Sequence, residues 1–296
     1  MTGGPPYDAA MVDTHARNAP RGIVGMVHVG ALPGTPRAAL APRELVAQAV
    51  REARVLREAG FDAVMIENMH DRPYLGGGIG PEVTACMSAV AAAVRAAVAD
   101  APVGVQVLGG GAREAVAVAH AAGLDFVRAE NFVFAHVADE GLMAEAAAGP
   151  LLRFRRSIGA DRVLVLADIK KKHASHAITA DADIAAFARA AEFFLADGVI
   201  VTGTETGAAV DERELAAVRA ATRLPVLTGS GADPSSVARL LAVADAVIVG
   251  SWIKEGGNWE NAVCARRAGE FAQAARSRAA GQAPGMDAVR AVMGSR

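Results

Sequence analysis

The chain has 296 residues, a net charge of −2 and 52% apolar residues, a balance typical of a globular protein with a large core. The chain has no excess of basic residues, so nucleic acid is not an expected partner. It has no apolar stretch long enough to cross a bilayer, so no membrane span is expected. Cys86 and Cys264 are the only cysteines and lie far apart, which argues against a disulfide framework or a cysteine zinc site and favours the cytoplasm.

The two ends of the chain differ in composition from the middle. Residues 1–20 contain Gly-Gly-Pro-Pro and lack apolar periodicity, so we expect a disordered leader without the apolar core of a secretory signal. Residues 281–296 are expected to form a loosely ordered tail. A single domain is expected to occupy residues 21–280.

One pattern recurs along this domain: a short β-branched run, a polar or glycine-rich loop, and an amphipathic stretch. Each unit is near the ~30-residue size of a strand–helix pair. The eight apolar runs, which predict buried strands, are Ile23–Val29, Ala63–Ile66, Val103–Leu108, Phe126–Ala129, Val163–Ala167, Val199–Thr202, Val226–Thr228 and Ala246–Val249. The amphipathic stretches, which predict helices, are Arg43–Ala59, Glu82–Ala99, Ala112–Ala122, Asp181–Ala196, Glu212–Thr222, Pro234–Val243 and Trp259–Arg276.

Glycines mark the ends of the predicted helices. Gly60, Gly123, Gly159 and Gly198 stand where a helix must stop before the next strand, a common place for a left-handed residue. Eight such units within ~260 residues favour one α/β domain, a (β/α)₈ TIM barrel. An open, doubly wound sheet is the alternative.

Two glycine–serine turns follow the seventh and eighth predicted strands. In TIM barrels the loops after these strands form the usual phosphate site, because glycine lets backbone amides approach an anion closely. Either turn alone would be read as an ordinary connection, but both at the two expected places predict a phosphate cradle. Its residues are Gly229, Ser230, Gly231, Gly250 and Ser251.

Polar residues stand at the exits of five consecutive predicted strands. Barrel enzymes carry their chemistry at these C-terminal ends. A single polar residue there is more often part of an ordinary solvated rim, but five strands in a row predict a site. The catalytic candidates are Glu67, Asp168 and Lys170, and the substrate-binding candidates are His28, Asn68, Gln106, Arg128, Asn131, His173, Thr202 and Thr204.

The segment LADIKKKHASH holds the densest of these clusters. Asp168 and Lys170 are two residues apart, which places them on the same side of an extended segment. Glu67 and Asp168 would then act as acid and base, with Lys170 as an electrostatic or proton-transfer partner. A Schiff base on Lys170 is disfavoured, because a lysine beside a carboxylate stays protonated. A metal held by His28, Glu67, Asp168 and His173 is an alternative that no spacing favours; the sequence requires no cofactor.

Several strings resemble the BtpA/SgcQ family: GMVHVGALPGTP, LADIKKKHASH, DGVIVTGTETG, PVLTGSGA and ADAVIVGSWIKEGGNWENAV. They spread in the family's order over residues 22–274. The resemblance implies a TIM barrel of the ribulose-phosphate-binding type. It also implies links to photosystem I biogenesis in one branch and to sugar metabolism in another.

Together these features predict an enzyme that acts on a phosphorylated sugar, a glycosyl phosphate or a nucleoside. Acid–base chemistry at the anomeric or carbonyl carbon would cleave or transfer a glycosidic bond, or isomerise or split the sugar phosphate. The alternative is a non-catalytic assembly factor that kept the barrel and its pocket. A homo-oligomer is expected, because barrels of this class often self-associate.

Overall fold

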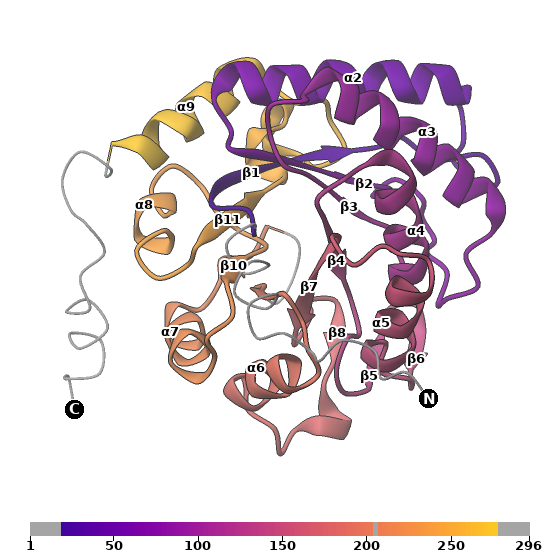
Figure 1. The fold of residues 1–296 in the computed structure, drawn as a ribbon. Coiled ribbons are helices and arrows are strands. Elements are labelled where there is room, and N and C mark those ends of the chain that lie inside the picture. Colours follow the sequence, from indigo (N-terminus) through magenta and orange to yellow (C-terminus); the bar gives the residue numbers. More distant parts are fainter. Residues whose placement is uncertain (1–18, 204–206, 278–296) are drawn as a thin grey trace, which may run out of the picture.

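Eight parallel strands close into a barrel in the computed structural model, which describes residues 19–203 and 207–277 (Figure 1). The order around the barrel is β1-β11-β10-β9-β7-β4-β3-β2, so every strand has two neighbours and no edge is exposed. The prediction of a TIM barrel is confirmed, and the open sheet is excluded. The strands are β1 (Gly22–His28), β2 (Ala63–Glu67), β3 (Val103–Gln106), β4 (Phe126–Ala129), β7 (Leu164–Ile169), β9 (Gly198–Val201), β10 (Val226–Thr228) and β11 (Ala246–Val249).

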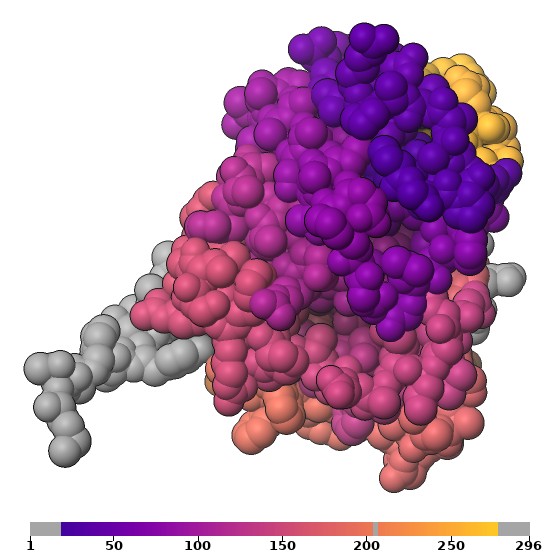
Figure 2. Space-filling view, turned by 90° about the vertical axis from the view of Figure 1, so that its right-hand side faces the viewer, coloured from indigo at the N-terminus to yellow at the C-terminus, as the bar shows by residue number. Residues whose placement is uncertain are grey.

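Helices surround this barrel and follow the strands in alternation (Figure 1). They are α2 (Pro42–Ala59), α3 (Pro81–Ala97), α4 (Ala112–Ala122), α5 (Ala148–Ser157), α6 (Ile184–Phe193), α7 (Glu212–Ala221), α8 (Val237–Leu240) and α9 (Ala265–Arg276). In the space-filling view, the first half of the chain makes up most of one side of the molecule, with α9 at the upper edge (Figure 2). No helix of the described residues is long and apolar enough to span a membrane.

Side chains fill the inside of the barrel. Val24, Met26, Met65, Phe126 and Leu166 belong to one buried cluster formed by inward-facing strand residues. A second and larger cluster packs the outward-facing strand residues against the helices. The alternation of strand side chains between these two clusters explains why both faces of each strand are apolar.

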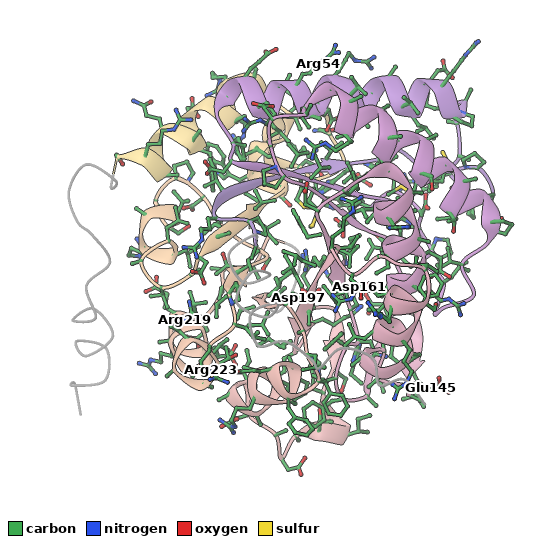
Figure 3. All side chains as sticks on the ribbon, in the orientation of Figure 1. Arg54, Glu145, Asp161, Asp197, Arg219 and Arg223 are labelled. Atoms are coloured by element: carbon green, nitrogen blue, oxygen red, sulfur yellow. The ribbon has the colours of Figure 1, made fainter. Side chains whose placement is uncertain are left out.

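A repeated aspartate secures the N-terminal ends of the strands. Asp245 stands directly before β11, and its Oδ2 accepts hydrogen bonds from the Val226 amide (2.9 Å) and from the Arg219 guanidinium (2.8 Å). Asp125 accepts in the same way from the Val103 amide and the Arg95 guanidinium. Asp197 accepts from the Val165 amide and the Arg155 guanidinium. Figure 3 labels Asp197 and Arg219. These ion pairs hold the strands in position at the N-terminal end of the barrel. The loops that carry functional sites in TIM barrels lie at the C-terminal end.

The structure adds three features to the predicted elements. Helix α5 has no counterpart in the prediction, and a small sheet of β5 (His136–Ala138), β6 (Gly141–Met143) and β8 (Ala174–Ser175) lies outside the barrel. The last helix begins at Ala265 and not at Trp259, because residues 254–264 form a loop. The predicted leader lies outside the described residues except for its last two positions, and the predicted tail lies wholly outside them.

Candidate functional site

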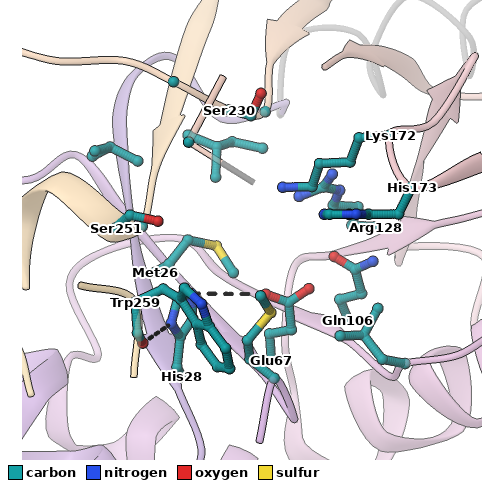
Figure 4. Close-up of a pocket in the computed structure, with 18 of the residues that line it drawn as sticks. Met26, His28, Glu67, Gln106, Arg128, Lys172, His173, Ser230, Ser251 and Trp259 are labelled. Atoms are coloured by element: carbon teal, nitrogen blue, oxygen red, sulfur yellow. Dashed lines mark hydrogen bonds and ion pairs between the residues drawn. The ribbon is translucent and has the colours of Figure 1, made fainter. Parts of the chain in front are cut away.

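A cavity of about 540 Å³ opens at the C-terminal ends of the barrel strands. Figure 4 shows it bounded by Ser230 and Ser251 on one side and by Arg128, Lys172 and Gln106 on the other. The predicted site residues that line this cavity are His28, Glu67, Gln106, Arg128, His173, Gly229, Ser230, Gly231, Gly250 and Ser251. The strand-exit rule therefore brings most of the predicted residues into one place.

The register of the first three strands sets three of these side chains in a row. His28 ends β1 and is paired with Glu67 at the end of β2, which in turn is paired with Gln106 at the end of β3. Residues in register across neighbouring strands project to the same face. All three are buried, and the Oε1 atom of Gln106 has no hydrogen-bond partner among the described residues.

His28 and Glu67 form a pair with opposite shifts in pKa. The Nε2 atom of His28 lies 3.9 Å from Oε2 of Glu67. Burial, and next the nearby charge of Lys254, lowers the pKa of His28 well below its ordinary value. Burial raises the pKa of Glu67 against the opposing effect of Arg128. The environment thus favours a neutral imidazole beside a carboxyl group that holds its proton to higher pH than usual.

A loop carbonyl fixes the tautomer of His28. Its Nδ1 lies 2.8 Å from the carbonyl oxygen of Trp259, in the loop after β11. Because a carbonyl oxygen only accepts, Nδ1 carries the proton and Nε2 presents its lone pair towards Glu67. The guanidinium of Arg72 lies 4.6 Å from the centre of the Trp259 ring and pairs with Glu260 on the same loop. These contacts hold the Trp259 loop against the mouth.

Arg128 and Asp168 form a buried ion pair that leaves the arginine facing the cavity. The Nε atom of Arg128 donates to both carboxylate oxygens of Asp168, at 2.9 and 3.1 Å. Burial opposes the charge of Arg128, but Asp168 and Glu67 outweigh it and raise the pKa of the guanidinium. Asp168 itself is not part of the cavity lining, which makes it the support of Arg128 rather than a partner of Glu67.

The three consecutive lysines after β7 make different contacts. Lys170 has a φ of 46°, so the chain is not extended there, and its Nζ lies 5.5 Å from the centre of the Phe187 ring. The prediction that Asp168 and Lys170 share one side assumed an extended segment, and the backbone does not provide it. Lys171 is buried against Glu130, with Nζ to Oε1 at 3.3 Å. Lys172 is the lysine that lines the cavity together with Lys171.

The two glycine–serine turns line the cavity. The hydroxyl of Ser230 is already engaged, since it accepts from the Gly203 amide and donates to the Ala208 carbonyl, both at 2.8 Å. Among the described residues, none accepts a hydrogen bond from the amides of Ser230, Gly231, Gly250 or Ser251. A Cβ atom on Gly250 would lie 3.1 Å from Nε2 of His28, so this turn and the His28–Glu67 pair are adjacent.

Five predicted site residues lie outside the cavity lining, and a sixth lies outside the described residues. Asn68 joins two loops by binding the Leu108 backbone and Asp71, and Asn131 donates to the Glu145 carbonyl. Thr202 accepts from the Lys172 amide at 3.1 Å. The five are Asn68, Asn131, Asp168, Lys170 and Thr202; the sixth is Thr204.

The cavity lining also includes residues that the prediction missed, among them Lys172, Trp259 and Arg72. Lys172 was available in the sequence as the third residue of the lysine run, but Trp259 was assigned to a helix. For the metal alternative, the described residues contain no group of three or more histidine, cysteine, aspartate or glutamate side chains arranged to hold an ion.

Fold and cavity together define a (β/α)₈-barrel protein whose candidate site occupies the C-terminal mouth. The chain belongs to the BtpA family, whose model matches residues 19–277. It is 42% identical over 253 residues to an uncharacterized mitochondrial protein of Caenorhabditis elegans, covering 84% of this chain and 91% of the relative. It is 34% identical to the photosystem I biogenesis protein BtpA of Synechocystis, covering 85% and 87%.

Solved structures of low sequence identity share the fold. The thiamine phosphate pyrophosphorylase of Pyrococcus furiosus aligns with a TM-score of 0.55 at 15% identity, covering 88% of this chain and 98% of that one. A 3-hexulose-6-phosphate synthase aligns with a TM-score of 0.54 at 17% identity, covering 86% and 99%. Both structural neighbours are named for phosphorylated compounds.

Proposed function

We propose that this protein is an enzyme that performs acid–base chemistry at the anomeric or carbonyl carbon of a phosphorylated sugar. The observation that carries the proposal is the His28–Glu67 pair, in which burial lowers one pKa and raises the other. Pairs of titratable groups whose environments separate their pKa values mark acid and base assignments. The names of the structural neighbours support the phosphorylated substrate.

In the proposed reaction, His28 accepts a proton and Glu67 donates one. The Nε2 lone pair of His28 is available because Nδ1 is held by the Trp259 carbonyl. Glu67 is protonated more readily than an ordinary glutamate, so it can protonate a leaving oxygen or a carbonyl oxygen. Proton transfer of this kind contributes typically ~10²–10⁴-fold to a rate.

The glycine–serine turns would anchor the phosphate. The unengaged amides of Ser230, Gly231, Gly250 and Ser251 supply donors of the kind that bind anions in barrels of this class. Arg128 lines the cavity beside the first turn, since a Cβ on Gly229 would lie 3.3 Å from one of its guanidinium nitrogens, and its raised pKa keeps it charged. Binding energy from a phosphate held here would position the reacting carbon beside His28 and Glu67.

A binding screen tests the proposal. Sugar phosphates, nucleotides and their unphosphorylated counterparts are compared by thermal shift; a ligand at 100 times its Kd stabilises a protein by about 2.7 kcal/mol. Gly250→Ala places a methyl group 3.1 Å from Nε2 of His28 and should abolish that stabilisation. Gly269→Ala, where nothing lies within 4 Å of the added carbon, is the matched control. Equal stabilisation by unphosphorylated sugars would contradict the phosphate assignment.

Turnover assays on the ligands that bind test the acid–base roles. We expect Glu67→Gln and His28→Gln each to lower turnover by about 10²-fold or more while ligand binding persists. Turnover at the wild-type rate in both variants would refute the roles given to these residues.

The second candidate is a non-catalytic assembly factor, which the name of the Synechocystis relative favours. An exposed apolar patch at the end of α6 supports it: Phe193 is 81% exposed, Phe194 49% and Leu195 47%. This helix leads into β9, so the patch lies at the end of the barrel opposite the cavity. Loss of partner binding in Phe193→Ser with ligand binding intact would favour this role.

We expect the protein in the cytoplasm, because its two cysteines are free. The relative from Caenorhabditis elegans is described as mitochondrial. We also expect the protein to form a homo-oligomer, and light scattering on the purified protein would test this.

A further inference from the structure

The chain uses lysine at four positions only, against 26 arginines. Arginine therefore serves nearly every site at which a positive charge is enough. Three of the lysines follow β7 and the fourth, Lys254, follows β11, so all four stand at the C-terminal end of the barrel. Two properties distinguish lysine from arginine: its ammonium group is compact, and it can lose its proton where burial lowers its pKa.

Three of the four lysines have a structural explanation. Lys254 is fully buried, with Nζ 2.9 Å from Oε2 of Glu52, where a compact ammonium suits the space. Lys171 is buried between two carboxylates, Glu130 and Glu140. Lys170 lies against the ring of Phe187. None of the three presents a free amine to the cavity.

Lys172 differs from the other three. Its Nζ forms no ion pair with any carboxylate of the described residues, and its side chain lines the cavity on the same side as Arg128 (Figure 4). The hydrogen bond from its amide to Thr202 fixes the backbone from which it projects. Burial, and next the charge of Arg128, lowers the pKa of Lys172 although Glu67 and Asp168 act against this. A larger share of this amine is therefore neutral and nucleophilic.

We propose that Lys172 forms an imine with the carbonyl carbon of a phosphorylated ketose or aldose. This rests on the proposed function and narrows it from sugar phosphates in general to those with a free carbonyl group. Charge alone does not explain a lysine at this position, because arginine supplies charge throughout the chain and cannot deprotonate.

The step balances without any further reactant. The neutral amine of Lys172 attacks the carbonyl carbon, the carbonyl oxygen takes a proton from Glu67, and the ammonium proton of the adduct passes to the Glu67 carboxylate. Return of that proton to the hydroxyl group expels one water molecule and leaves the carbon–nitrogen double bond. Glu67 is near enough to Lys172 to affect its pKa, and its own raised pKa suits a group that donates and recovers a proton.

Borohydride trapping tests the imine. The full-length protein is incubated with dihydroxyacetone phosphate, ribulose 5-phosphate or fructose 6-phosphate, reduced with sodium borohydride and digested for peptide mass mapping. Reduction of the imine adds the mass of the sugar phosphate less one oxygen atom. We expect this adduct on Lys172 at a level on the order of tenfold or more above that on Lys170, Lys171 or Lys254, because Lys172 alone of the four both lines the cavity and lacks a carboxylate partner among the described residues. Lys172→Arg should abolish it and Lys170→Arg should keep it.

The outcomes separate this inference from the proposed function. Thermal stabilisation by these sugar phosphates without an adduct on Lys172 would overturn the imine and leave the proposed function standing. An adduct of equal level with the unphosphorylated ketoses would support the imine and overturn the phosphate assignment. The peptide map of the wild-type protein decides between the four lysines even if Lys172→Arg fails to fold.

Discussion

Removal of the charge on Asp168 tests whether Arg128 depends on it. The two side chains are 5% and 1% exposed, and Nε of Arg128 donates to both carboxylate oxygens. Asp168→Asn keeps the shape, removes the charge and leaves only one oxygen to accept. Breaking a buried ion pair by removing one partner destabilises a protein by roughly 3–5 kcal/mol. Glu67 also favours the charged arginine, so we expect the lower end, about 3 kcal/mol.

Urea unfolding measures this loss as a lower midpoint at an unchanged m-value, and thermal unfolding as a fall of about 6–12 °C. Glu270→Gln is the control, because Arg266 and Glu270 are 70% and 46% exposed and such pairs contribute less than about 1 kcal/mol. The double variant Arg128→Met with Asp168→Leu removes both charges and should recover much of the stability. A loss in Asp168→Asn no larger than in the control would refute the supporting role of Asp168.

Three further predictions concern the pH dependence of stability, two glycine substitutions and the buried Lys254. The pKa of His28 is lowered in the folded state, so the unfolded chain binds a proton on this imidazole at a higher pH than the folded chain does. The free energy of unfolding should therefore fall as pH drops below about 6.5, by up to ~1.4 kcal/mol per pH unit. Urea unfolding at several pH values should show that His28→Gln lacks this part of the pH dependence. Gly231→Ala should destabilise by more than about 1 kcal/mol, since φ is +65° and the added carbon would collide with the Ala208 carbonyl oxygen. Gly269→Ala, in a helix, should instead stabilise slightly, and equal effects of the two substitutions in calorimetry would contradict both expectations. Lys254→Met should raise the pKa of His28, which NMR titration would show, because Lys254 is one of the charges that lower it.

The barrel could be predicted from the sequence because its strands are buried on both faces. Apolar runs such as Val226–Thr228 and Ala246–Val249 reappear as β10 and β11 with the same bounds. The aspartates before β4, β9 and β11 are a further signal that the sequence contains and that the prediction did not use. Helix α5 was missed because the segment before it, rich in Ala and Gly, gives no clear periodicity.

The site could be predicted only as far as strand position determines it. His28, Glu67, Gln106 and Arg128 reach the cavity because each stands at the end of a strand whose register is fixed by its neighbours. Beyond the strand ends, the direction in which a side chain projects depends on backbone angles that cannot be read from the residue type. Lys170 adopts φ 46°, a conformation that is uncommon for lysine, and this turns the run so that Lys172 faces the cavity.

Buried polar groups occur at both ends of the barrel, and their hydrogen-bond partners differ. At the N-terminal end, Asp125, Asp197 and Asp245 satisfy both a backbone amide and an arginine. Among the described residues, Gln106 and Glu130 at the C-terminal end each keep a buried oxygen without a partner, while Arg57 Nε and His120 Nδ1 are unpaired in the last turns of α2 and α4. A buried polar atom left unpaired costs about 1–3 kcal/mol. Because Gln106 and Glu130 line the cavity, a ligand with donor groups bound there would recover that cost.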